Sequence, residues 1–343
     1  MKPKIIYEVS IIRPLIILIL VIFHCFCIYK GKWEPIPSIN AIPSYYWFSN
    51  FIFGFCLETF VLISGYIYAF QQIELNKQIN LPSMIRKKFM HLIIPCWFFG
   101  LLYYLLITRN NGNIDNPILY IFNGAGHLWF LPMLFWCFIF LHLIIHTRIN
   151  KKIIFIILSI ISIIPMPSIT MHFGLIRVPH FLFYFYSGYI LWIYKDKFCA
   201  HFLKLRWIIL FASLHFFLIY LDCNIYDLNP DKHNITIYIK LLHRSMDYFI
   251  PLLGIISLFL TIYLFTYKKQ IRLPQWIIES GKLCFGIYIF HQFIIKYLYY
   301  QTNLPELVGS YLLPWISLVL SLLISIILSK LLIQTKIGKF LIG

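Results

Sequence analysis

Long apolar runs recur along the whole chain and are separated by short polar segments. Most runs hold about 20 mostly apolar residues, the length that an α-helix needs to cross ~30 Å of hydrocarbon, and the fifth is shorter. Ten runs occur, at residues 10–29, 48–71, 89–107, 127–146, 153–167, 175–194, 205–221, 247–267, 281–300 and 310–333. They predict an all-α fold, a polytopic membrane helix bundle of about ten transmembrane helices that forms a single domain over residues 1–343.

Composition and charge placement agree with this prediction. Of the 343 residues, 61% are hydrophobic and only 12% are charged, which excludes an ordinary soluble globular domain. The net charge of +17 is compatible with nucleic-acid binding, but the basic residues form short clusters beside the runs and not one soluble face. They are interpreted as topology determinants, because cytoplasmic loops carry an excess of Lys and Arg. Both termini are therefore predicted to be cytoplasmic, and residues 222–246 are predicted to form an outer loop.

Other sequence signals are weak or absent. The eight cysteines include no C-x-x-C pair, so neither a disulfide framework nor a structural metal site is expected. The first run is followed by no small-residue cleavage site, so it is expected to be retained and not removed as a signal peptide.

Two polar residues in the first run form the first candidate site. An ionisable side chain within a membrane span costs a few kcal/mol and is a functional candidate by default. Arg13 and His24 are 11 residues apart, which at 100° per residue puts them on one helix face, ~16 Å apart along the axis. Either residue alone is compatible with a structural role, but their shared face favours a common function.

The second run carries Glu58 near the predicted membrane centre. A buried carboxylate needs a partner, which Arg13, His24 or His291 is able to supply. A structural ion pair without chemistry is the alternative. Ser64 follows in the same run, and small residues of this kind also occur simply because they permit close helix approach.

Later runs add four further candidates. His127 and Trp129 stand at the outer start of the fourth run, where aromatic belts commonly place such residues. Tyr288 and His291 lie three residues apart in the ninth run, on adjacent turns of one helix.

The set of motifs resembles membrane-bound acyltransferase family 3. Arg13 and His24 match that family's Arg, ten residues, His signature, and ETFVLISGY at residues 58–66 is similar to its acidic-x-Phe-Phe-x-x-Ser-Gly-Phe pattern. The remaining similar segments, in chain order, are RKKFMHLIIPCWF at 86–98, HLWFLPML at 127–134, FYFYSGYIL at 183–191 and GKLCFGIYIFH at 281–291. Two departures are His91, where many members have Arg, and Cys284, where many have Ser.

The resemblance implies an integral membrane O-acyltransferase acting on surface sugars, here a stand-alone member without a fused periplasmic domain. Its implied partners are membrane lipid, cytoplasmic acyl-CoA, most simply acetyl-CoA, and a saccharide or lipid-linked saccharide acceptor. The implied location is the bacterial plasma membrane, and no metal and no nucleic acid are expected.

The residues suggest how such a reaction runs. His24 is the expected general base, since an imidazole with a pKa of about 6.5 takes a proton at neutral pH. We expect Arg13, Arg86, Lys87 and Lys88 to bind the CoA phosphates, and Glu58 to orient His24 or to balance Arg13. Trp129 or Tyr288 is a candidate donor to the tetrahedral oxyanion.

Two other functions fit the hydropathy. A transporter or flippase for a sugar or lipid-linked glycan also needs many spans and buried ionisable residues, but the chain lacks half-to-half similarity. A receptor or sensor leaves the motif set unexplained. Dependence on acyl-CoA distinguishes the acyltransferase from both.

Overall fold

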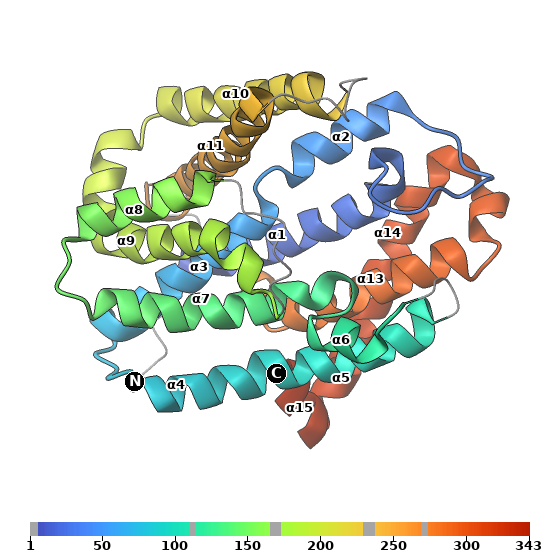
Figure 1. Cartoon of the computed structure of the whole chain (residues 1–343), viewed down its shortest axis with the longest axis horizontal. Helices are drawn as coiled ribbons and strands as arrows, with labels where there is room; N and C mark the ends of the chain where they lie inside the picture. Colours follow the sequence, from blue (N-terminus) through green and yellow to red (C-terminus); the bar gives the residue numbers. More distant parts are fainter. Residues whose placement is uncertain (1–5, 110–113, 165–172, 229–236, 269–273) are drawn as a thin grey trace. The chain divides into compact units, whose positions relative to one another are not determined.

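The chain folds into helices throughout the part that the structure describes. The computed structural model describes residues 6–109, 114–164, 173–228, 237–268 and 274–343, and every regular element in these ranges is helical (Figure 1). Two compact units make up the chain. Unit 1 comprises Met1–Phe53, Lys88–Pro132 and Leu273–Gly343, and unit 2 comprises Gly54–Lys87 and Met133–Arg272. The all-α bundle is confirmed, and its description as a single domain stays a prediction.

Unit 1 is built around the first helix of the chain. Its long helices are α1 (Tyr7–Phe26), α2 (Pro43–Phe53), α5 (Ile94–Tyr103), α13 (Cys284–Tyr300) and α14 (Leu304–Ile333), with the short helices α6 (Pro117–Phe122), α12 (Gln275–Ser280) and α15 (Lys336–Ile342). Helix α1 packs against α2, α13 and α14. The first and the last long helices of the chain thus belong to the same packed unit.

Serines let α14 pack closely within unit 1. Four of them recur every fourth residue and are fully buried, namely Ser317, Ser321, Ser325 and Ser329. Residues four apart share one helix face, so the small side chains form a continuous stripe. Opposite it, a methyl group added at Gly286 of α13 would lie 2.2 Å from the Ser329 Oγ.

Unit 2 is organised around two parallel helices in contact. Its helices are α3 (Cys56–Ala69), α4 (Leu81–Lys88, up to Lys87), α7 (Phe130–Ile145, from Met133), α8 (Lys151–Ile163), α9 (Val178–Phe202), α10 (Leu205–Asp222) and α11 (Ile237–Tyr263). Helices α3 and α9 share the most extensive contact. A methyl group at Gly65 would lie 1.9 Å from the Phe185 carbonyl oxygen, and one at Gly188 would lie 1.8 Å from that of Leu62. The two backbones therefore touch directly.

Seven helical stretches in the described residues are long and apolar enough to cross a membrane. They are Tyr7–Lys30, Pro43–Glu74, Leu81–Thr108, Gly126–Ile145, Leu205–Tyr226, Ile237–Tyr267 and Leu304–Ile333, and each overlaps a predicted run. A polytopic membrane protein is therefore confirmed. The count of ten spans and the cytoplasmic termini stay predictions. The predicted run at 153–167 corresponds to the 13-residue α8. The last three residues of the run, 165–167, lie outside the described ranges.

One predicted boundary is wrong, and two other predicted runs agree with the helical stretches but differ in detail. The outer loop predicted at 222–246 contains the start of α11 at Ile237, since its last ten residues include no Gly or Pro that would break a helix. Residues 229–236 lie outside the described ranges. The predicted run at 48–71 is interrupted at Gly54 and Phe55, between α2 and α3. The run predicted to start at residue 127 begins as the short 3₁₀ helix η5 (Gly126–Trp129).

The backbone contact in unit 2 predicts the effect of adding one methyl group. We expect Gly188→Ala to lower the thermal unfolding midpoint of the detergent-purified protein, because overpacking against a backbone costs about 1–3 kcal/mol or more. Gly281→Ala is the matched control, since its added methyl group would meet only the Ile278 carbonyl oxygen, at 3.4 Å. Equal midpoints for the two variants would contradict the close contact.

Candidate active site

Three buried histidines lie together in unit 1. His24 stands near the end of α1, His127 in η5 and His291 in α13. The His24 and His291 ring centroids are 4.9 Å apart, those of His127 and His291 5.0 Å, and those of His24 and His127 6.4 Å. The exposed fractions of the residues are 9% for His24, 6% for His127 and 0% for His291, so His24 is the most accessible of the three.

The contacts of His291 determine which nitrogen of His24 is free. The His291 Nδ1 lies 2.9 Å from the Ile287 carbonyl oxygen, which only accepts, so Nδ1 carries the proton. A neutral His291 then has its lone pair on Nε2, which lies 2.9 Å from the His24 Nδ1. His24 therefore donates through Nδ1, and its Nε2 keeps an unprotonated lone pair. This is the arrangement that a general base requires.

An aromatic ring and a lysine flank His24. The Trp33 ring is stacked on the imidazole with centroids 5.9 Å apart, and the Lys296 Nζ lies 4.2 Å from the Trp33 ring centroid. A cation over an indole face is attracted by the ring quadrupole. Sequence reasoning missed both residues. Lys296 is an ionisable residue inside a predicted run, and this feature could have identified it as a candidate. Trp33 stands in a polar connection between runs, where no such signal marks it.

His127 is bound tightly by α13. Its Nε2 lies 2.8 Å from the Tyr288 carbonyl oxygen, and its Nδ1 lies 2.8 Å from the Gln292 Oε1. The Tyr288 hydroxyl in turn donates to the His127 carbonyl oxygen at 2.7 Å. Four predicted candidates, His24, His127, Tyr288 and His291, thus lie in one cluster. Trp129 is half-buried two residues after His127 in the same 3₁₀ turn.

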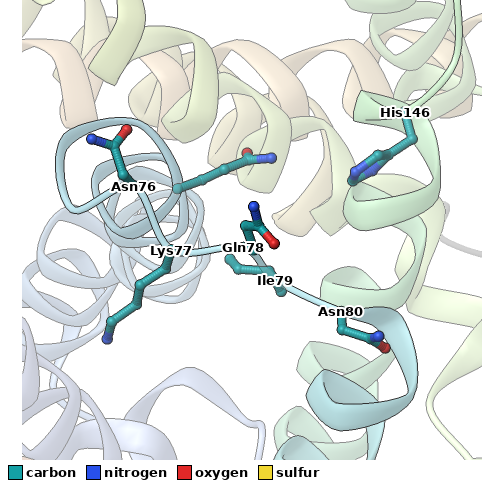
Figure 2. Close-up of a pocket in the computed structure, with 7 residues that line it drawn as sticks. Asn76, Lys77, Gln78, Ile79, Asn80 and His146 are labelled. Atoms are coloured by element: carbon teal, nitrogen blue, oxygen red, sulfur yellow. The ribbon is translucent and has the colours of Figure 1, made fainter.

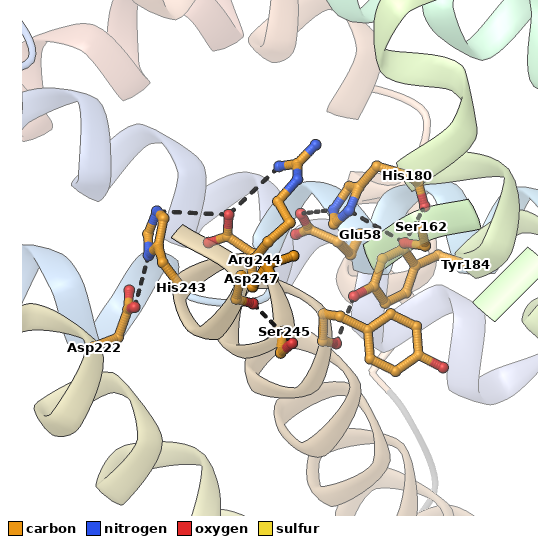
Figure 3. Close-up of polar contacts among 11 residues, drawn as sticks. Glu58, Ser162, His180, Tyr184, Asp222, His243, Arg244, Ser245 and Asp247 are labelled. Carbon is orange, nitrogen blue, oxygen red and sulfur yellow. Dashed lines mark hydrogen bonds and ion pairs between the residues drawn. The ribbon is translucent and has the colours of Figure 1, made fainter. Parts of the chain in front are cut away.

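Glu58 has its own partner within unit 2 (Figure 3). Its Oε1 lies 3.4 Å from the His180 Nε2, and the His180 Nδ1 lies 3.4 Å from the Ser162 Oγ. The Ser64 hydroxyl donates to the Phe60 carbonyl oxygen of its own helix at 2.9 Å. A role for Glu58 beside His24 stays a prediction. His180 is another ionisable residue within a predicted run that sequence reasoning missed.

The family comparison decides the class of protein. The family model described as an acyltransferase domain, of acyltransferase family 3, matches residues 6–333, which include every candidate residue above. This chain belongs to acyltransferase family 3. No curated protein and no solved structure matches it. Membership makes the protein a membrane acyltransferase and gives no support to the transporter alternative.

The basic residues predicted to bind the acyl donor fall in both units of the acyltransferase. Arg13 is exposed on α1 in unit 1, although it shares this unbroken helix with the buried His24. Lys88 also belongs to unit 1, whereas Arg86 and Lys87 are exposed on α4 in unit 2. Their combined role as one phosphate site stays a prediction.

Unit 2 of the acyltransferase also contains a polar pocket of about 560 Å³ (Figure 2). Its lining consists of Gln72, Asn76, Lys77, Gln78, Ile79, Asn80 and His146. The Tyr189 hydroxyl donates to the Gln72 Oε1 at 3.3 Å, and the His146 Nδ1 donates to the His142 carbonyl oxygen at 2.7 Å. The lining thus offers amides, one ammonium group and one imidazole, and it contains no carboxylate.

A second polar group in unit 2 is internally paired. The His243 Nδ1 lies 2.7 Å from the Asp222 Oδ1, the His243 Nε2 lies 3.7 Å from the Asp247 Oδ2, and Arg244 pairs with Asp247 at 3.5 Å (Figure 3). One ligand-type atom from each of Asp222, His243 and Asp247 lies within 4.8 Å of the others. Each of these atoms already contacts a protein partner, so the geometry is that of an ion-pair network.

The contact between Glu58 and His180 predicts non-additive substitutions. Glu58→Gln and His180→Gln each remove the same interaction, so the double variant should lose about 0.5–1.5 kcal/mol less stability than the sum of the single variants. Unfolding of the purified variants in detergent measures this coupling. The control pair is Glu58→Gln with His201→Gln, an exposed residue near the end of α9. Additive losses in both pairs would exclude an energetic coupling of Glu58 to His180.

Proposed function

We propose that this acyltransferase moves an acyl group, most simply acetyl, from cytoplasmic acyl-CoA to a hydroxyl group of a surface or lipid-linked saccharide. The observation that supports this proposal most directly is the contact of the His24 Nδ1 with the His291 Nε2. This contact leaves an unprotonated lone pair on the His24 Nε2, and His24 is the most accessible histidine of the cluster. His24 is the general base, and His291 is the residue that orients it.

The reaction begins with this base, the acceptor hydroxyl and a bound thioester. The His24 Nε2 takes the proton of the acceptor hydroxyl while the hydroxyl oxygen bonds to the thioester carbon, which gives a tetrahedral oxyanion. The oxyanion collapses, the C–S bond breaks, and the proton passes from His24 to the departing sulfur. A thiol with a pKa near that of cysteine, about 8.5, leaves readily.

Binding of the acyl-CoA donor depends on basic residues for its phosphates and on the distance from Arg13 to His24 for its pantetheine arm. Arg13 lies 11 residues before His24 on one continuous helix, which corresponds to ~16 Å along the axis and to the reach of a pantetheine arm. Arg13, Arg86, Lys87 and Lys88 hold the phosphates through charge-assisted hydrogen bonds. The carboxylate of Glu58 is paired with the His180 imidazole in unit 2. No metal takes part in this scheme.

The oxyanion requires hydrogen-bond donors, for which Trp129 and Tyr288 are the candidates. Use of the Tyr288 hydroxyl requires that it leave the His127 carbonyl oxygen, to which it donates at 2.7 Å. The acyltransferase acts in this proposal as a multi-pass protein of the bacterial plasma membrane, where donor and acceptor approach from opposite sides.

Removal of the base tests the catalytic step. We expect His24→Ala to lower the rate of acyl transfer from acetyl-CoA by about 10²–10⁴-fold, the usual contribution of general base catalysis. The measurement is O-acetylation of surface polysaccharide in cells, with membrane insertion checked by protease protection. His201→Ala should keep normal transfer, since His201 is exposed near the end of α9 and belongs to neither the histidine cluster nor the proposed phosphate site. Full transfer by an inserted His24→Ala protein would exclude His24 as the base.

Donor binding is tested separately from catalysis. Acetyl-CoA should raise the thermal unfolding midpoint of the purified protein. This increase should be clearly smaller in Arg13→Ala and persist in His24→Ala, because Arg13 is one of the four proposed phosphate-binding residues and His24 is not. Free CoA serves as the reference ligand. If no acyl-CoA stabilises the protein at saturating concentration, the proposed donor is wrong.

A further inference from the structure

Both ring nitrogens of His127 face oxygen atoms that accept hydrogen bonds. The Nε2 lies 2.8 Å from the Tyr288 carbonyl oxygen and 3.1 Å from that of Ile289, and the Nδ1 lies 2.8 Å from the Gln292 Oε1. Backbone carbonyl oxygens have no proton to give. A neutral imidazole carries one proton, so it would leave one lone pair directed at an oxygen.

Rotation of the Gln292 amide does not remove this conflict. Exchange of its oxygen and nitrogen would give the His127 Nδ1 a donor, and such exchanges are often needed. However, the backbone N–H of His127 donates to the same Gln292 atom at 3.0 Å, which requires an oxygen there. The Tyr103 hydroxyl also donates to it, at 3.3 Å. The Gln292 Oε1 is therefore an acceptor, and the His127 Nδ1 must carry a proton.

We infer that His127 is an imidazolium ion, protonated on both nitrogens, and that its positive charge stabilises the negative charge that develops during acyl transfer. This role rests on the proposed function. A buried charge is costly unless hydrogen bonds satisfy it, and here three oxygens do so. All three are uncharged, so the positive charge is not neutralised. The oxyanion of the tetrahedral intermediate supplies the missing counter-charge.

His127 acts in this proposal through its charge and not through contact with the substrate. Its two N–H groups are already used by α13, so neither remains for an acyl group. The groups that face it are the imidazoles of His24 and His291 and the hydroxyls of Tyr103 and Tyr288, while Lys296 is the nearby cation on the Trp33 side of His24. A fixed positive charge beside His24 also opposes protonation of this base, so His24 stays unprotonated and able to accept a proton at lower pH.

The protonation state is tested without any activity measurement. Protein with ¹⁵N-labelled histidine is reconstituted in lipid at pH 7, and solid-state NMR distinguishes protonated from bare ring nitrogens. The His127 signals are those missing in His127→Gln. If that variant does not fold, Gln292→Glu serves instead, because the side chain at 292 contacts the His127 Nδ1 directly, at 2.8 Å, so the added charge shifts this signal most. Two protonated nitrogens at His127 are expected, and one bare nitrogen would overturn the proposal even if acyl transfer by His24 is confirmed.

The electrostatic role is tested by the pH dependence of the rate. Loss of the positive charge in His127→Gln makes His24 easier to protonate, so the acidic limb of the pH–rate profile should move to higher pH by about one unit, as expected for charges ~6 Å apart in a partly screened site. His201→Gln should leave the profile unchanged. A His127→Gln protein that is slower at every pH, with its acidic limb unmoved, would show that His127 serves packing only.

Discussion

A buried imidazole is held in place by the hydrogen bonds of its ring nitrogens, and this constraint determines the arrangement of the histidines in unit 1. Water is not available inside a helix bundle in lipid to satisfy polar groups that the protein leaves unpaired. The carbonyl oxygens of α13 bind His291 through Nδ1 and His127 through Nε2. One helix therefore orients both histidines, and through His291 it also orients His24. Close packing of α1, α13 and α14 keeps these contacts in place, which explains the serine stripe on α14.

Apolar periodicity predicts the fold class but not the points where helices break. Runs of about 20 apolar residues indicate membrane helices because lipid requires their backbone groups to be paired internally. The break between α2 and α3 falls at Gly54 and Phe55, inside an uninterrupted apolar run, so hydropathy carries no sign of it. The start of α11 at Ile237 was missed for the opposite reason, because Lys240, His243 and Arg244 give that stretch the charge of a polar connection although it is helical.

The candidate site was predictable as a set of residues and not as a set of contacts. The cost of ionisable groups in lipid identifies His24 and His291, and the same argument identifies Lys296 and His180 when it is applied to every run. The choice of partners depends on tertiary packing, since His24 and His291 are 267 positions apart. His127 was compatible with an ordinary aromatic belt, and only its contacts with Tyr288 and Gln292 distinguish it. Gln292 is uncharged, so a search for ionisable residues does not find it.

The direct backbone contact between α3 and α9 has a mechanical consequence. Their glycines bring the two parallel helices together at Gly65 and Gly188, and the Glu58–His180 contact joins them before this point. Beyond it, Tyr189 of α9 donates a hydrogen bond to Gln72, in the helical segment Phe70–Glu74 that follows α3. Contacts at three successive levels oppose both twisting and sliding of one helix against the other. The contacts therefore hold α3 and α9 as one rigid pair, which also fixes the position of Gln72 at the edge of the polar pocket.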